Sequence, residues 1–189
     1  MALPSHLQVA LKEWASVCDA LAGGRQILIL RKGGILDRGG VFELEERQFL
    51  LFPTYLHQKA DLLKPSEHAA LQTRDAEPAQ VTFTNAAVVT DVLKLSSRAE
   101  ADALDHEHIW TPRQIDMRFS YRPASPLYLV LLRVYRLSRP TTIANTPVYG
   151  GCRSWVPLDQ AIETSGAIPS LSDQQFSARH NAVLNAIAR

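Results

Sequence analysis

Short apolar runs that end abruptly at charges, glycine or proline constrain the fold of this chain more than any other feature. Residues 27–30 (ILIL) are followed by two cations and two glycines, and residues 49–52 (FLLF) end at Pro53. The longest run, residues 127–132 (LYLVLL), is far too short to cross a bilayer. Apolar runs of this length between turn residues are typical of buried strands. The sequence therefore predicts a fold built around a sheet.

The overall composition is that of an ordinary globular domain. With 46% hydrophobic and 21% charged residues, the 189-residue chain can bury a full core, and we expect a single domain over residues 1–189. The net charge of +1 gives no bulk electrostatic argument for nucleic acid. Only five of the 20 basic residues are lysines, and arginine favours bidentate contacts with phosphate. The alternative explanation for the preference for arginine over lysine is an excess of surface arginines that have no role in phosphate binding. Two cysteines are too few for a disulfide framework, and no secretory leader is evident. We therefore expect a soluble cytoplasmic protein that does not bind a membrane. We also expect that the protein needs no cofactor.

Periodicity and punctuation predict the secondary structure. Apolar residues from Leu7 to Leu21 recur at steps of four and three, which predicts an amphipathic helix that ends at Gly23. The segment from residue 26 to residue 52 resembles a small antiparallel meander. Further helices are predicted at 54–63, from Ser96 or Ser97 to 104, at 111–121 and at 172–188, and further strands at 81–83, 87–95 and 127–137. Together these elements predict an α+β fold with a mixed, largely antiparallel sheet on which the N- and C-terminal helices pack.

The first candidate anion site follows the strand at residues 26–31. Arg31 and Lys32 place two cations beside Gly33 and Gly34, whose backbone amides can form a concave anion site. The pattern is no phosphate-binding P-loop, because the GxxxxGK[ST] spacing is absent. A plain hairpin turn with solvated charges beside it is the alternative.

A second candidate site follows the strand at residues 49–52. Thr54, His57 and Gln58 stand where we expect a helix to begin, and free amides at the start of a helix bind anions. The His57 imidazole can act as a general acid or base near neutral pH. A capped helix with a half-buried histidine is the alternative interpretation.

Two further arginines extend this hypothesis. Arg133 and Tyr135 alternate along the strongest predicted strand, so one face carries both a cation and an aromatic ring. One solvated sheet face explains that alternation equally well. Arg153 lies in a glycine-containing loop. We predict that these residues form an arginine-rich concave surface, which binds nucleic acid or another phosphate-bearing ligand.

Several ordered motifs carry a family resemblance. These are residues 12–14 (KEW), 31–35 (RKGGI), 49–55 (FLLFPTY) with 57–58 (HQ), and 149–155 (YGGCRSW). Together they resemble the prokaryotic domain-of-unknown-function family 1802 over nearly the whole chain. The resemblance implies one compact domain and brings no activity and no catalytic residue with it.

A metal-dependent nuclease is the alternative function. A helix with Glu13, followed by strands with Asp37 and Glu43 or Glu45, matches the αβββ order of the PD-(D/E)XK nuclease core. Such an enzyme uses its carboxylates to hold Mg²⁺ and a lysine to steady the attacking water. Here Arg47 stands where that lysine is expected, so the motif is degenerate, and surface acids in hairpins produce the same order.

Overall fold

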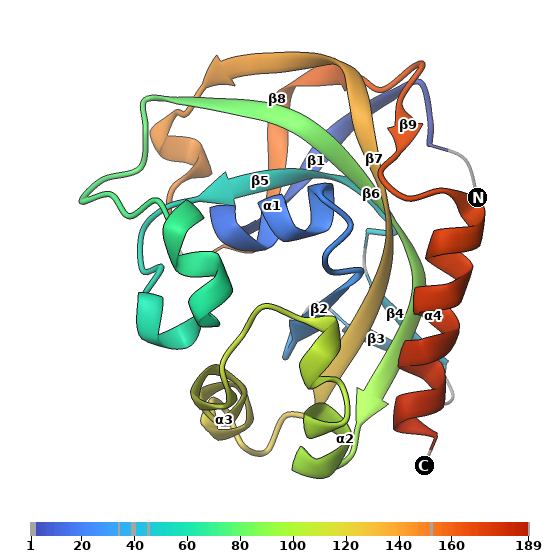
Figure 1. The fold of residues 1–189 in the computed structure, drawn as a ribbon. Coiled ribbons are helices and arrows are strands. Elements are labelled where there is room, and N and C mark those ends of the chain that lie inside the picture. The colour runs from blue at the N-terminus through green and yellow to red at the C-terminus, as the bar shows by residue number, and fades with distance from the viewer. Residues whose placement is uncertain (1–2, 34, 39–40, 45, 152, 189) are drawn as a thin grey trace.

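The chain forms one large sheet with helices around it (Figure 1). The computed structural model describes residues 3–33, 35–38, 41–44, 46–151 and 153–188, with backbone alone for 35–38 and 41–43. The strands are β1 (His6–Trp14), β2 (Leu28–Arg31), β3 (Ile35–Arg38), β4 (Val41–Leu44), β5 (Gln48–Thr54), β6 (Gln80–Leu95), β7 (Leu127–Ala144), β8 (Trp155–Glu163) and β9 (Ile168–Pro169). The helices are α1 (Ala15–Ala22), α2 (Arg98–Asp102), α3 (Pro112–Ser120) and α4 (Asp173–Ile187), with short 3-10 helices η1 (Ala60–Leu62), η2 (Pro65–Ala70), η3 (Asp105–Glu107) and η4 (Pro147–Tyr149).

The strand order of the large sheet is β2-β7-β6-β5-β1-β8, and β9 adds to β7. Among the described strand pairs, β1 and β5 are the parallel pair and the others are antiparallel. This confirms the predicted α+β class and the largely antiparallel sheet. The parallel pair brings the carboxyl ends of two strands to the same edge, where chains commonly place ligand sites.

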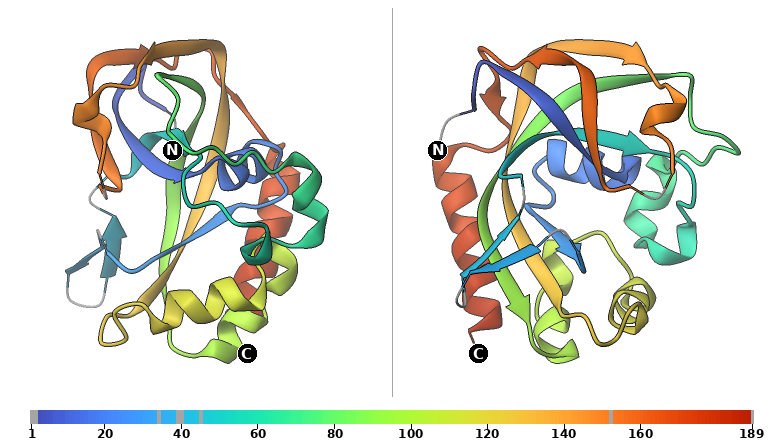
Figure 2. Two further views of the ribbon diagram at one scale, coloured as in Figure 1. Left: turned by 90° about the vertical axis from the view of Figure 1, so that its left-hand side faces the viewer. Right: turned by 180° about the vertical axis from the view of Figure 1, so that it is seen from behind.

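Two long strands run the height of the molecule, with α4 along one side and α2 and α3 below (Figures 1 and 2). β6 and β7 pair over almost their whole length, with register shifts between Phe83 and Asn85 and between Val89 and Asp91. Such bulges bend a strand and increase its twist. Apolar side chains of the sheet form two buried clusters, a larger one that contains Leu129 and a smaller one that contains Phe83.

The first predicted helix is only partly correct. Residues from His6 to Trp14 form β1, and the helix begins at Ala15. Leu7 and Leu11 fit a helical stripe, but Leu7, Val9 and Leu11 also alternate with period two. Pairing with β5 and β8 favours the second pattern, because long-range contacts override local periodicity.

Two other expectations were wrong, and both errors concern connections. No helix begins at Thr54, which ends β5, and only the short η1 and η2 follow. The predicted meander separates: β3 and β4 form their own two-stranded sheet, while β5 joins the large sheet. The segments at 81–83 and 87–95 are parts of the single strand β6.

Three predicted helices with clear boundary residues are confirmed. The Ser97 hydroxyl accepts a hydrogen bond from the amide of Glu100 at the start of α2. Thr111 and Pro112 open α3. Ser172 and Gln175 form a reciprocal capping box at the start of α4, which covers the sheet as expected of the C-terminal helix.

A buried anchor precedes α3. The Nδ1 atom of His108 accepts a hydrogen bond from the Trp110 amide at 3.3 Å, and Trp110 is almost fully buried. The Lys64 ammonium donates to the carbonyl oxygens of Asp105 and, at 2.9 Å, of His108. Burial lowers the pKa of His108 from its usual 6.5 to about 4, and the Lys64 charge acts in the same direction. These contacts fix the position from which α3 extends.

No helix in the described parts of the chain is both long and apolar enough to cross a membrane.

Candidate anion-binding cleft

A cleft with a volume of about 610 Å³ opens at the carboxyl ends of β1 and β5. One wall comes from the two strand ends and the turn after β5, and another from η4 and the loop that leads to β8. In Figure 1 the arrowhead of β5 points toward this side of the molecule. Its charged and histidine lining residues are Lys12, Glu13, Arg31, His57, Glu77, Arg118 and Arg153.

Local geometry follows from the parallel pairing. Trp14 of β1 lies opposite Thr54 of β5, and the Thr54 hydroxyl donates to the Glu13 carbonyl oxygen at 3.0 Å. The chain then turns directly into α1, with Trp14 as the residue before its first turn. The first turn of α1 contains no acidic residue.

The amino terminus of α1 is capped by a residue from a distant part of the chain. The Gln58 side-chain oxygen accepts hydrogen bonds from the Ser16 amide at 3.0 Å and from the Ser16 hydroxyl at 2.8 Å. Gln58 is only 5% exposed. Gln58 therefore serves the fold rather than the ligand for which it was predicted.

Glu13 and Arg31 neutralise each other at the base of the cleft. Their side chains are 8% and 11% exposed, and Arg31 Nη1 lies 3.3 Å from Glu13 Oε1. A buried carboxylate needs such a partner, because removal from water is costly. Arg31 thus lines the predicted site, but its charge is already directed at Glu13.

Lys12 of β1 connects the strand ends with the opposite wall of the cleft. Its ammonium donates to the carbonyl oxygens of Tyr149 and, at 3.4 Å, of Gly151, and it lies 5.6 Å from the centre of the Phe52 ring. The Tyr149 hydroxyl is hydrogen-bonded to the Asp159 carboxylate at 2.8 Å. Burial raises the pKa of Tyr149, so the phenol stays protonated and the wall carries no negative charge from it.

The second acidic residue of the cleft is also engaged. The Glu77 carboxylate accepts hydrogen bonds from the Tyr55 amide at 2.9 and 3.1 Å and from the Leu56 amide at 2.9 Å. These are the backbone donors at which the sequence predicted an anion. The amides of the predicted anion-binding turn therefore do bind a carboxylate, but this carboxylate is the Glu77 side chain of the same protein.

Two arginines and a histidine in the cleft have no hydrogen bond or ion pair with any residue that the structure describes. Arg118 comes from α3, Arg153 from the loop before β8 and His57 from the turn after β5. His57 has a φ of 68°, a conformation that non-glycine residues rarely adopt. Outliers of this kind gather at functional sites, where the surrounding structure holds them.

The structure brings together four of the predicted ligand residues. Arg31, Thr54, His57 and Arg153 line this one cleft. Sequence reasoning missed Lys12, Glu77 and Arg118. Lys12 stands in one of the family motifs, whereas nothing in the sequence connects Glu77 or Arg118 with the other residues.

Two predicted residues next to Arg31 lie outside the cleft. Lys32 donates to the backbone oxygens of Phe119 at 2.9 Å and Arg122 at 3.3 Å, which ties β2 to the end of α3. Gly33 is exposed, and Gly34 lies outside the described residues. Of the described residues of this predicted site, Arg31 lines the cleft, and Lys32 and Gly33 do not.

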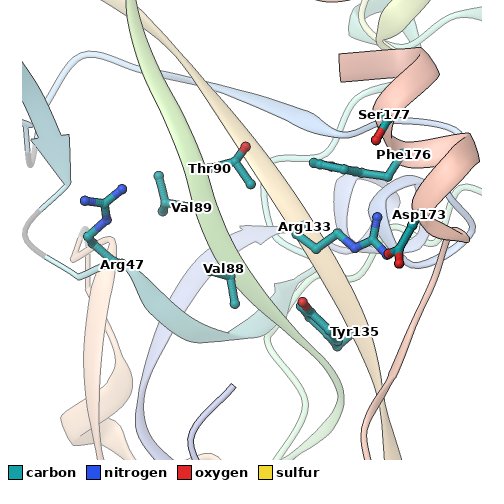
Figure 3. A pocket seen from close by; sticks show the side chains of 9 residues that line it. All are labelled: Arg47, Val88, Val89, Thr90, Arg133, Tyr135, Asp173, Phe176 and Ser177. Carbon is teal, nitrogen blue, oxygen red and sulfur yellow. The ribbon is translucent and has the colours of Figure 1, made fainter. Parts of the chain in front are cut away.

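Arg133 was wrongly grouped with the others. It lines a separate pocket of about 440 Å³ between the sheet and α4, together with Tyr135, as their alternation predicts (Figure 3). Its guanidinium lies 2.6 Å from the Asp173 carboxylate and 4.7 Å from the centre of the Phe176 ring. Arg133 is thus paired with the start of α4, and we expect it to hold that helix.

The nuclease alternative loses the element order on which it was based. Glu13 lies on β1 rather than on a helix, and it is paired with Arg31. Asp37 and Glu43 lie on β3 and β4, outside the large sheet, their side chains are not described, and Glu45 lies outside the described residues. Among the described residues, no group of three or more histidine, cysteine, aspartate or glutamate side chains is placed to hold a metal ion. The proposed Mg²⁺ site stays a prediction.

Comparison with known proteins identifies the family. A profile described as a domain of unknown function (DUF1802) matches residues 10–182. The chain belongs to the DUF1802 family. This confirms the resemblance seen in the sequence motifs, and DUF1802 carries no assigned activity in its description. A comparison with curated protein sequences gave no match.

The fold has distant similarity to crystal structures of ASCH from Zymomonas mobilis. One such structure has a TM-score of 0.45 at 10% identity and covers 92% of this chain and 93% of that chain. Two variants of the same protein have TM-scores of 0.42 and 0.41, also at 10% identity, with 95% and 92% of this chain and 98% and 96% of those chains covered. Similarity at this level says nothing about the ligand.

Proposed function

We propose that this chain is a binding module for a phosphate-bearing ligand, a single-stranded nucleic acid, and that it binds the ligand in the cleft at the ends of β1 and β5. The proposal rests on the charged side chains that line the cleft. Glu13 and Glu77 are both engaged internally, whereas Arg118, Arg153 and His57 face the cleft without a described partner. A cleft with two guanidinium groups that have no partner among the described residues attracts anions and can hold phosphate oxygens in pairs.

Two features favour a nucleic acid over a bare anion. Half-buried Trp14 lines the cleft and offers an aromatic surface, and stacking on such a surface binds bases of any sequence. The volume of about 610 Å³ lies in the range of sites for small ligands and suits one nucleotide unit of a longer strand. We expect the bound phosphate to lie against Arg118 and Arg153.

The test is binding of a fluorescently labelled single-stranded RNA or DNA oligonucleotide, followed by anisotropy at several salt concentrations. We expect Arg118→Ala and Arg153→Ala each to weaken binding about three- to tenfold and to reduce the salt slope by about 1, because each removes one phosphate contact. Arg136→Ala is the matched control, since Arg136 is an exposed arginine of β7 that does not line the cleft.

The outcomes separate the forms of ligand. Absence of binding at low salt, or equal losses from the cleft and control variants, contradicts the proposal. Competition by a nucleoside monophosphate as strong as that by the oligonucleotide identifies a small-molecule site instead of a strand-binding site.

A further inference from the structure

The turn that presents His57 is fixed on its amino-terminal side by Glu77. One carboxylate oxygen accepts hydrogen bonds from the amides of both Tyr55 and Leu56, each at 2.9 Å, and the second oxygen lies 3.1 Å from the Tyr55 amide. Charge-assisted bonds to two successive amides define the orientation of the peptide groups that lead into His57.

The same turn is fixed on its carboxyl-terminal side by Gln58. This buried side chain accepts bonds from Ser16 and donates to the Gln72 carbonyl oxygen at 2.7 Å. His57 stands between the two fixed points with a φ of 68° and an exposed side chain. A histidine keeps this conformation only where its surroundings determine it.

Glu77 is itself held in place. The Asn145 side chain donates to the Pro78 carbonyl oxygen at 2.9 Å, and the Asn145 amide donates to the Ala79 carbonyl oxygen at 2.8 Å. On the other side of Glu77, the Arg74 guanidinium lies over the Tyr55 ring at 4.5 Å. The segment from residue 72 to residue 79 is thus attached around Glu77, so its carboxylate is a fixed part of the turn.

We infer that Glu77 is a positioning residue for ligand binding, which holds His57 in the cleft for contact with a phosphate group of the ligand. This inference rests on the proposed function and adds the role of an acidic residue to it. Glu77 acts through the backbone of residues 55–57, and it does not touch the phosphate.

The inference opposes the simplest electrostatic expectation. Glu77 brings a negative charge to a cleft that binds anions, so its removal should strengthen binding if charge alone matters. If Glu77 positions His57, its removal weakens binding. Glu77→Gln and Glu77→Ala remove the same charge, but glutamine keeps one oxygen that can accept both amide bonds.

The experiment measures oligonucleotide affinity by anisotropy for the wild-type chain and these two variants. We expect Glu77→Ala to bind about tenfold more weakly, which is the effect of losing the single contact between His57 and the phosphate, and Glu77→Gln to lie between it and the wild type. Asp75→Ala is the matched control, because it removes an exposed acidic residue of the same segment that does not line the cleft. Thermal melting verifies folding, and if Glu77→Ala fails to fold, Glu77→Gln alone decides.

Two further readouts separate positioning from a general structural effect. In a His57→Ala background, the Glu77→Ala substitution should cause no additional loss of affinity, because both act on one contact. Hydrogen exchange at the Leu56 amide, measured without ligand, should be faster in Glu77→Ala than in the wild type and unchanged in Asp75→Ala.

Several results would overturn the inference. Tighter binding by Glu77→Ala and Glu77→Gln shows that Glu77 competes with the ligand, and additive losses with His57→Ala show that the two residues act separately. If the wild-type chain binds no oligonucleotide, the proposed function fails. The Leu56 exchange rate then still tests whether Glu77 fixes the turn before His57, and an unchanged rate in Glu77→Ala contradicts that role.

Discussion

His108 is 6% exposed and sits at the anchor before α3, where its Nε2 atom is buried without a hydrogen-bond partner in the described part of the chain. Its pKa of about 4 in the folded protein lies below the usual 6.5 of an unfolded chain. Between these two values the unfolded chain binds more protons than the folded one, so the free energy of unfolding falls as the pH falls. The stabilisation is complete above about pH 6.5 and is lost as the pH decreases toward about 4.

The magnitude follows from the two pKa values. Between about pH 7.5 and about pH 5, His108 alone should lower the free energy of unfolding by about 2 kcal/mol, and the full effect below about pH 4 is about 3 kcal/mol. A loss of about 2 kcal/mol is a substantial fraction of the stability of an ordinary domain.

The assay is urea unfolding at a series of pH values, with His108→Asn as the comparison. Asparagine keeps an acceptor for the Trp110 amide and does not titrate. The substitution lowers stability by itself, so the quantity compared is the change with pH and not its absolute value. Identical pH dependence for the wild-type chain and His108→Asn over this range would refute the reasoning.

Two further substitutions test the framework of the cleft. Arg31→Met should lower the free energy of unfolding by about 3–5 kcal/mol, because it leaves the Glu13 carboxylate buried without its partner, and the double variant with Glu13→Leu should recover most of the loss. Urea unfolding of the three variants measures this, and a loss below about 1 kcal/mol for Arg31→Met contradicts a structural role for the pair. Gln58→Ala should cost about 1–2 kcal/mol through the lost cap of α1, whereas replacement of the exposed neighbour Lys59 by alanine should change stability little.

The sequence predicted the elements whose signals are local. Ser97, Pro112 and Ser172 mark helix starts by their own hydrogen bonds or ring geometry. The sequence placed Pro112 and Ser172 correctly and left Ser96 as the alternative to Ser97. β1 was mistaken for a helix because its apolar residues satisfy two periods, and only the distant strands β5 and β8 decide between them.

The residues of the candidate site were likewise predicted only in part. Arg31, Thr54, His57 and Arg153 were selected because they follow strands or lie in glycine-containing loops, and they do line one cleft. Arg133 was selected for its alternation with Tyr135 along a strand, but its guanidinium is ion-paired with Asp173 of α4. Glu77 could not be found, since its partners are two backbone amides of a distant turn.

The parallel pairing of β1 with β5 has a consequence for how the chain folds. Parallel neighbours cannot form through a tight hairpin, so the ends of these strands meet only after the intervening chain has closed a long loop. The cleft also needs residues from the loop before β8, late in the sequence. β6 and β7 themselves do not line the cleft, although Ala79 and Asn145, which flank their paired ends, do. We therefore expect ligand binding to be acquired in the last kinetic phase of folding, which makes it a reporter of the complete native topology.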